Sequence, residues 1–386
     1  MDFSLTDEQQ LMVENIKEYC EQYFTNEQVE KYYADQQVAP EALKAWVDAG
    51  FGLLGLPEEY GGVPADLVTI GLALETVHHY SGCWVPFLNN FVTMYDVMEF
   101  GGKPDLVKFC VDEYLKTGEP PVSLAISEPE AGSDNKNMST ITQKQADGTY
   151  RLKGVKTFLT QGDRSPYMIV VAKDEDPARE NMNISMWLVP RDAEGVSLSH
   201  LHKIGERCLT ICEAYFDDVV LEEKDRISED SNSFVKLMHG LEMERMFLSA
   251  QSLGCAQAAM DDAAAYCSQR VTFGKPIGSY QLVQERLTNM ETKLQTMRMF
   301  LYKTLWDYDN GISVRTNSAL LKRYCVTSAF EVCDNAMQLM GGIGYMQDVR
   351  ISRLWLDARG NRFGGGADDI MVHIAGRQLV KQYAQD

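Results

Sequence analysis

Three long amphipathic helical patterns fill the last third of the chain, and they limit its possible folds more than any other feature. Apolar residues recur three and four positions apart through residues 234–269, 282–308 and 313–340. Antiparallel helices of this length commonly bury their apolar faces in a four-helix bundle. We therefore predict a C-terminal helical bundle domain over residues 229–386.

The preceding part of the chain has two further textures. It begins with a capping box, in which Thr6 stands three residues before Gln9, and helical patterns follow at residues 40–49, 67–79 and 104–116. Short alternating or continuous apolar runs, typical of strands, then cover residues 122–126, 149–155, 168–172, 184–189, 196–201 and 214–221. The prediction is an α+β multidomain fold with an N-terminal helical domain (1–119), a central antiparallel β-barrel-like domain (120–228) and the C-terminal four-helix bundle.

Charge and cysteine content exclude several classes of protein. With 36 Lys and Arg against 56 Asp and Glu, the net charge is −20. The electrostatic field of such a negative protein repels nucleic acid. No apolar run approaches about 18 residues, and the opening MDFSLTDEQQ lacks the regions of a signal peptide. The nine cysteines form no C-x-x-C pair and no pattern typical of a metal site. We therefore expect no membrane insertion, no bound metal, reduced thiols and a cytoplasmic location.

Three glycine-containing segments are candidates for ligand binding, although each also has an ordinary structural explanation. Residues 124–134 (LAISEPEAGSD) leave a strand and enter a turn that suits an anion or a planar ring, or that forms a plain surface loop. Residues 270–277 (RVTFGKPI) suit a nucleotide site or a capped helix end. Residues 338–344 (QLMGGIG) end a helix with a glycine cap. No G-x-G-x-x-G segment follows a parallel strand, so a nicotinamide site is not supported.

One carboxylate lies on the apolar side of the helix predicted for residues 234–269. At about 100° per residue, Glu244 falls within roughly 60° of four apolar residues, whereas Glu242 lies nearly opposite. The four residues are Leu237, Leu241, Leu248 and Cys255. Burial raises the pKa of a carboxyl group, which favours a general base that works near neutral pH. A structural ion pair with the adjacent Arg245, or a wet cleft beside the stripe, would explain the same pattern.

Four motifs in one order resemble the acyl-CoA dehydrogenase family of flavoproteins. They are LAISEPEAGSD, KTFLTQG (156–162), RVTFGKPI with Gln281, and QLMGGIGY (338–345), and they run over nearly the whole chain. This resemblance implies the three domains predicted above, with FAD bound non-covalently between the central and C-terminal domains and partly across a subunit interface. It also implies an acyl-CoA thioester as substrate, electron-transferring flavoprotein as electron carrier, and a homotetramer, with a homodimer as the alternative.

The resemblance implies cofactor-binding roles for residues in all four motifs. Ser127 would contact the flavin ring, Phe158 would stack on it, and Thr160 would hydrogen-bond its N5 atom. Ser133 would lie near the pyrophosphate and the thioester tail. Two further matches in the central domain are Leu124 and Ile126. Contacts to the adenine and diphosphate, partly from the partner subunit, would come from Arg270, Phe273, Gln281, Gln338, Gly341 and Gly342.

The same resemblance implies that Glu244 is the catalytic base. Many family members carry this glutamate near the C-terminus in a Tyr-Glu-Gly-Thr sequence, but here residues 362–369 read RFGGGADD, and Gly365 takes its place. A minority keep the base on the long helix as a glutamate directly before an arginine, which Glu244 and Arg245 match. Asp368 and Asp369 are rival candidates. Substrate contacts are expected from Ser133, Glu242, Arg245 and Gly365.

Within the family, four features look most like bacterial crotonobetainyl-CoA reductases of carnitine metabolism. They are the Glu-Arg pair, the GGG-x-D-D loop, the ISRLW segment (351–355) and the opening MDFSLTDEQ. Such an enzyme reduces a 2,3-enoyl-CoA to γ-butyrobetainyl-CoA, with hydride passing from flavin N5 to the β-carbon and the α-proton coming from Glu244. A general short- or branched-chain acyl-CoA dehydrogenase is the main alternative. Glu244 disfavours a desulfinase-like relative, and a flavin-binding or purely structural helical protein is the non-enzymatic alternative.

Overall fold

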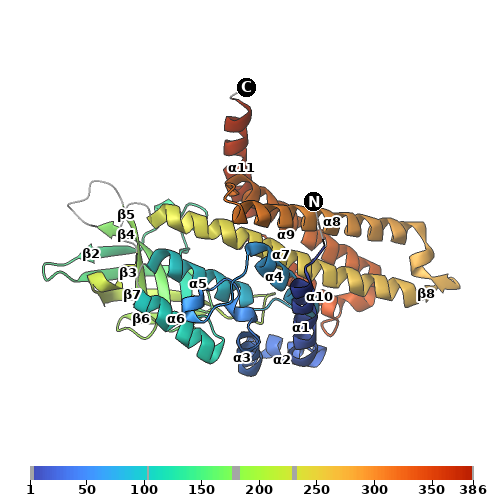
Figure 1. Ribbon diagram of the computed structural model, residues 1–386, viewed down its shortest axis with the longest axis horizontal. Helices are drawn as coiled ribbons and strands as arrows, with labels where there is room; N and C mark the ends of the chain where they lie inside the picture. The colour runs from blue at the N-terminus through green and yellow to red at the C-terminus, as the bar shows by residue number, and fades with distance from the viewer. Residues whose placement is uncertain (1–3, 102–103, 176–182, 228–232, 385–386) are drawn as a thin grey trace.

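A computed structural model describes residues 4–101, 104–175, 183–227 and 233–384. Figure 1 shows an elongated molecule with the sheet at one end, long helices extending to the other, and shorter helices packed beside them. The predicted boundary at residue 228 and the first three residues of the opening motif lie outside the described part. Among the described residues, no helix is both long and apolar enough to cross a bilayer.

The N-terminal part of the chain is helical, as predicted. Its helices are α1 (Asp7–Tyr23), α2 (Asn26–Asp35), α3 (Pro40–Asp48), α4 (Leu67–Ser81), α5 (Phe87–Gly101) and α6 (Pro104–Thr117). The capping box is confirmed, because Thr6 Oγ1 accepts from the Gln9 backbone N–H at 3.2 Å and Gln9 Oε1 accepts from the Thr6 N–H at 3.1 Å. The apolar patterns did not predict α2 or α5. Helix α5 is rich in asparagine, aromatic and β-branched residues of modest helix propensity, so tertiary packing decides its conformation.

The central part forms a seven-stranded sheet of order β1-β4-β2-β3-β7-β6, in which β5 also pairs with β4. The strands are β1 (Val122–Ala125), β2 (Ile141–Lys144), β3 (Tyr150–Thr160), β4 (Tyr167–Glu175), β5 (Asn183–Pro190), β6 (Val196–His200) and β7 (Ile211–Leu221). Most neighbours are antiparallel, as predicted, but β4 runs parallel to β1 and β2. Side chains alternate in the same way in both kinds of pairing, so the sequence pattern does not reveal strand direction.

Long helices dominate the C-terminal part. They are α7 (Ser233–Gln269), α8 (Gln281–Asp309), α9 (Arg315–Met340), α10 (Arg350–Gly360) and α11 (Asp368–Tyr383), with a small hairpin of β8 (Val271–Thr272) and β9 (Lys275–Pro276) between α7 and α8. The three predicted long helices agree with α7, α8 and α9 to within two residues at each end. The short 3₁₀ helices of the chain are Phe51–Leu53, Glu58–Tyr60, Asn135–Asn137, Glu223–Asp225, Ile277–Ser279 and Gly341–Tyr345. Helix α11 projects away from the body of the molecule (Figure 1).

Helix α7 joins the two halves of the molecule. Near its start, Leu237 packs into an apolar core that also contains Val122 and Ile169 of the sheet. Farther along, Met246 and Leu253 belong to the core formed by the helices. The stretch between these contacts, which includes Glu244, therefore lies where the sheet and the helices meet.

Candidate active site

A cavity of about 1220 Å³ lies at this junction. From the central part of the chain, it is lined by six of the residues predicted to bind the cofactor: Leu124, Ile126, Ser127, Ser133, Phe158 and Thr160. From the C-terminal part, Glu244, Arg245 and Gly365 line the same cavity. Residues that the sequence assigned to cofactor, base and substrate thus share one site.

Glu244 is half-buried on α7 and lies close to the glycine loop, which is the segment of residues 361–367 between α10 and α11. A Cβ atom placed on Gly365 would lie 3.9 Å from Glu244 Oε1. Burial raises the pKa of Glu244, while the charges of Arg245 and Lys322 lower it. The carboxyl group therefore has the raised pKa that its position on the apolar stripe predicts.

The neighbours of Glu244 on α7 have separate partners. Arg245 is buried, and its Nε donates to the Gly365 carbonyl oxygen at 3.0 Å rather than pairing with Glu244. Glu242 is also buried, and its Oε2 lies 3.7 Å from His239 Nδ1. Glu242 does not line the cavity, so the structure does not bring this predicted substrate contact to the site.

The two rival aspartates lie outside the cavity lining as well. Asp368 accepts hydrogen bonds from Arg362 Nε at 2.6 Å and from Lys322 Nζ at 3.3 Å, so its carboxylate is already paired with two cations. Asp369 is exposed on the first turn of α11. Neither position suits a base that must reach a substrate in the cavity.

A buried ion pair holds the turn that follows β1. Lys156 Nζ lies 2.8 Å from Glu128 Oε1, with both side chains almost fully buried, and also donates to the Ile126 carbonyl oxygen at 2.8 Å. Glu128 further accepts from the backbone N–H groups of Ser139 and Thr140 at 2.6 and 2.9 Å. Burial opposes ionisation, but these hydrogen bonds outweigh it and lower the pKa of Glu128 to about 2. The pair fixes the segment that carries Ile126 and the cavity-lining serines.

Phe158 presents an open aromatic face in the cavity wall. Its side chain is 64% exposed and its φ is 61°, in the left-handed region that is unusual for a bulky residue. The register between β3 and β7 shifts between Lys156 and Leu159, which accounts for the local turn of the strand. An exposed ring held by a strained backbone suits stacking on a planar group such as a flavin.

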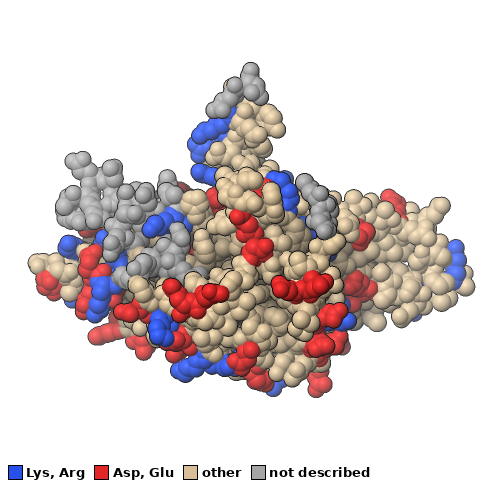
Figure 2. Space-filling view, in the orientation of Figure 1, with Lys and Arg blue, Asp and Glu red and all other residues tan. Residues whose placement is uncertain are grey.

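The cavity wall is more basic than the protein as a whole. Its cationic side chains are Lys203, Arg245, Arg315, Arg359, Arg377 and Lys381, and its carboxylates are Asp134, Glu206 and Glu244. Figure 2 shows basic side chains gathered on the projecting helix, whereas acidic side chains are spread over the body. In a chain of net charge −20, this local excess of cations suits a ligand that carries phosphate groups.

The remaining predicted cofactor residues lie elsewhere. The hairpin motif (Arg270, Phe273, Gln281) and the glycine motif (Gln338, Gly341, Gly342) are exposed and do not line the cavity. Both lie at the same end of the bundle, because Arg286 near the start of α8 donates to Asn335 near the end of α9 at 2.7 Å. Figure 1 places this end opposite the sheet. Within one chain, the two groups of predicted cofactor residues are therefore separate.

Sequence reasoning missed two ionisable residues near the cavity. Lys322 is fully buried on α9 and lies at helical spacing from the buried Ala319, Cys325 and Val326. Placing the residues of this helix at helical steps, as for Glu244, would therefore have put Lys322 on an apolar face. Glu206 lines the cavity from the loop after β6, where no periodic pattern exists. Burial raises the pKa of Glu206 to about 7, although nearby Lys203 lowers it.

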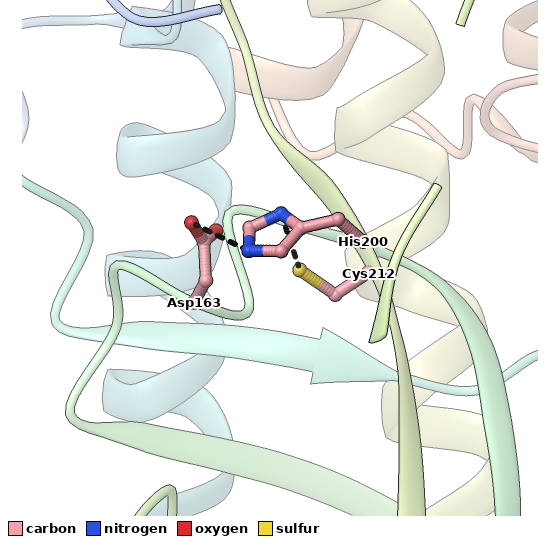
Figure 3. Close-up of side chains that lie close together, drawn as sticks. All are labelled: Asp163, His200 and Cys212. Carbon is pink, nitrogen blue, oxygen red and sulfur yellow. Dashed lines mark hydrogen bonds and ion pairs between the residues drawn. The ribbon is translucent and has the colours of Figure 1, made fainter. Parts of the chain in front are cut away.

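A cluster of Asp163, His200 and Cys212 lies beside the sheet (Figure 3). His200 Nε2 is 4.0 Å from Asp163 Oδ2, and His200 Nδ1 is 4.0 Å from Cys212 Sγ. Over the residues that the structure describes, it is the one group of three side chains arranged as metal ligands could be. Burial raises the pKa of Cys212 to about 11, so its thiol is protonated at neutral pH. Spacing does not reveal this cluster, because the cross-strand register of β6 and β7 brings His200 and Cys212 together.

Comparison with known proteins finds acyl-CoA dehydrogenases over nearly the whole length of the chain. The acyl-CoA dehydrogenase N-terminal, middle and C-terminal domains match residues 6–104, 123–219 and 234–380. A relative described as probable acyl-CoA dehydrogenase YdiO of Escherichia coli K12 is 42% identical over 385 residues, covering 99% of both chains.

Two solved structures are similar to this chain. The acyl-CoA dehydrogenase of Slackia heliotrinireducens has a TM-score of 0.89 and 35% identity, with full coverage of both chains. The butyryl-CoA dehydrogenase of Megasphaera elsdenii has a TM-score of 0.90 and 27% identity, covering 98% of this chain and 100% of the other. The chain therefore belongs to the acyl-CoA dehydrogenase family, whose members are FAD-dependent oxidoreductases that act on the CH–CH group of acyl-CoA thioesters.

Proposed function

We propose that Glu244 is the acid–base catalyst of this oxidoreductase. The observation that carries the proposal is the 3.9 Å distance between Glu244 Oε1 and the Cβ position of Gly365, where the family resemblance expects a glutamate in many members. A carboxylate on α7 thus reaches the space that a side chain at position 365 would enter. In the oxidative direction Glu244 accepts the α-proton of the thioester, and in the reductive direction its protonated form returns it.

The site also suits FAD. Leu124, Ile126, Ser127, Phe158 and Thr160 would hold the flavin ring, and FAD when bound supplies hydride exchange with the β-carbon. The hairpin motif and the glycine motif would hold the adenosine diphosphate end from a second copy of the chain, since both are exposed and remote from the cavity. This division favours a homotetramer or homodimer, and we propose electron-transferring flavoprotein as the electron partner.

For the acyl group, we propose crotonobetainyl-CoA, reduced to γ-butyrobetainyl-CoA. Trp84 and Glu206 line the cavity, and an aromatic ring and an acidic side chain suit a trimethylammonium group, which would compete with Lys203, 3.8 Å away, for Glu206. The aspartate pair of the GGG-x-D-D loop does not supply this environment, because neither residue lines the cavity. A butyryl-type substrate is the second candidate, favoured by the similarity to butyryl-CoA dehydrogenase.

Replacing Glu244 tests the proposed base. We expect Glu244→Gln to keep FAD and lower turnover by about a thousandfold, because an amide cannot carry the proton. Glu242→Gln is the matched control, since Glu242 lies two residues away on α7 but outside the cavity. Adding Gly365→Glu to Glu244→Gln should restore part of the rate, although its φ of 61° will strain the new side chain. Full turnover in Glu244→Gln would remove Glu244 from the mechanism.

Substrate choice is tested separately, by measuring turnover of crotonobetainyl-, butyryl- and isovaleryl-CoA with one holoenzyme preparation. The proposal expects the highest kcat/KM for reduction of crotonobetainyl-CoA. A preference for an uncharged saturated thioester would assign the chain to the short- or branched-chain dehydrogenases. A matched Glu206→Gln variant should lose discrimination for the charged substrate if this carboxylate contacts its cationic end.

A further inference from the structure

Two buried cationic side chains donate hydrogen bonds to the backbone of the glycine loop. Lys322 Nζ donates to the carbonyl oxygens of Gly366 at 2.8 Å and Arg362 at 3.2 Å, so one ammonium group connects the two ends of the loop. Arg245 Nε donates to the carbonyl oxygen of Gly365, between these two points, at 3.0 Å. Both side chains are at most 4% exposed. These three carbonyl groups therefore face the cations, and a Cβ atom on Gly365 would lie 3.5 Å from Arg245 Cγ, 3.7 Å from Leu248 Cδ2 and 3.9 Å from Glu244 Oε1.

The middle of the loop carries no side chains of its own, whereas Asn361 at its start is buried and donates to Ser252 Oγ at 2.9 Å. Residues 364–366 are three successive glycines, and Gly365 and Gly366 adopt φ values of 61° and 96°. Such a segment loses much conformational entropy when it is ordered. Hydrogen bonds from charged donors are stronger than those from neutral ones, which suits them to fixing a flexible segment.

The same cations act on Glu244 electrostatically. The charged groups near Glu244 are Arg245 on its own helix and Lys322 on α9, and the glycine loop contributes backbone at Gly365. Lys322 is in turn paired with Asp368 of α11, which also binds Arg362. Burial lowers the pKa of Arg245. The charge of Glu242 on α7 raises this pKa, and the charge of Arg315 at the start of α9 lowers it. Burial lowers the pKa of Lys322, whereas the negative charge of Asp368 raises it.

We propose that Lys322 is a positioning residue that fixes the glycine loop beside Glu244 and places a positive charge, balanced by Asp368, against the backbone of that loop. The inference rests on the proposed role of Glu244 as the base. It differs from that role because Lys322 does not line the cavity and acts only through the loop and the field. Lys322 and Asp368 thus form an ion pair, and their two charges have opposite electrostatic effects on the carboxyl group of Glu244.

Two variants with opposite expected effects test the proposed role of the Lys322–Asp368 ion pair. Lys322→Met keeps the length of the side chain but removes its charge, and Asp368→Asn keeps the lysine but removes its counter-charge. The readout is the pH dependence of kcat/KM for oxidation of butyryl-CoA by the holoenzyme with an artificial electron acceptor. Because the carboxylate is the active form, we expect the rising limb to move to higher pH by about one unit in Lys322→Met and to lower pH in Asp368→Asn. Lys322→Arg should keep the limb near its original pH.

A second readout does not depend on catalysis. Infrared spectroscopy of the protein between acid and neutral pH follows the carboxylic acid band of Glu244, which is assigned by its loss in Glu244→Gln. The band should titrate with the same two opposite displacements. If Lys322→Met does not fold, Asp368→Asn together with Lys322→Arg still tests the direction of the effect.

The outcomes separate the two proposals. Lower rates in both variants with an unmoved limb and an unmoved band would make Lys322 purely structural and overturn this inference, while Glu244 stayed the base. Unchanged turnover in Glu244→Gln would overturn the proposed function. In that case the infrared titration alone would still decide whether Lys322 controls the ionisation of Glu244.

Discussion

At the scale of single residues, buried ionisable groups differ in whether a partner compensates their burial. Lys156 and Glu128 form a buried ion pair, so each charge offsets the cost of burying the other. For Glu244, two nearby cations partly offset the effect of burial on its ionisation. His78 in α4 is a different case, because its side chain is fully buried and its Nε2 atom has no hydrogen-bond partner among the described residues. A buried imidazole of this kind is neutral in the folded protein.

His78 predicts an acid-sensitive stability. Burial lowers the pKa of His78 to about 4 from an ordinary value of 6.5, despite a hydrogen bond to the Leu74 carbonyl oxygen. Between these values the unfolded chain binds a proton at His78 that the folded chain does not, so the contribution of His78 to the free energy of unfolding is constant above pH 6.5 and falls as pH drops to 4. The loss from this residue is about 3 kcal/mol. Chemical denaturation of His78→Gln across this range should show a shallower fall, whereas His202→Gln, at an exposed histidine, should keep the fall seen in the parent chain.

At the scale of elements, a few side chains hold irregular segments to regular ones. The turn after β1 carries Ser127 and Ser133 to the cavity, and its position depends on the hydrogen bonds between Lys156, Glu128 and the backbone. The glycine loop depends in the same way on Lys322 and Arg245. Hydrogen bonds from buried charged groups therefore contribute to fixing both active-site segments.

Removing the charge of Glu128 should loosen the turn after β1. Glu128→Gln leaves the Lys156 ammonium group buried without its counter-charge, and we expect a loss of about 3 kcal/mol in the free energy of unfolding. Because the folded-state pKa of Glu128 is about 2, its contribution is fully present above about pH 4.5 and is lost as pH falls toward 2, so the difference between the two proteins should shrink in acid. The variant should also bind FAD more weakly, as measured by flavin absorbance after dialysis. Glu130→Gln, at an exposed carboxylate of the same turn, should change neither quantity.

At the scale of the whole molecule, helix α11 and the end of the bundle opposite the sheet are two of the places where described residues expose apolar side chains. Helix α11 projects from the body with Val372, Val380 and Tyr383 exposed by 50, 70 and 72% (Figure 1). At the end of the bundle opposite the sheet, Phe273 is 98% exposed on its hairpin. Exposed apolar groups of this kind favour contacts between copies, in agreement with the proposed homotetramer.

Assembly should therefore depend on α11. We expect Val372→Glu combined with Val380→Glu to shift the protein from the proposed tetramer to smaller species in sedimentation velocity, because burying a carboxylate at an interface is unfavourable. Leu11→Glu is the control, since Leu11 is 60% exposed on α1. An unchanged sedimentation profile in the double variant would exclude α11 from the interface.

The sequence by itself determined the order of helical, β and helical parts, the limits of α7, α8 and α9, and the location of Glu244 on an apolar stripe. These features depend on local periodicity, which any chain segment carries within itself. Helices α2, α5, α10 and α11 and strand β2 were less predictable, because their apolar patterns are short or interrupted.

Only the tertiary structure decided which distant residues meet. The direction of β4 against its neighbours, the separation of the hairpin motif from the cavity, and the pairing of Lys322 with the glycine loop are all non-local. The clearest example is the approach of Glu244 to Gly365, which lie on different elements and share no local periodicity. Periodicity fixes the face on which a side chain lies, whereas long-range packing fixes what that face meets.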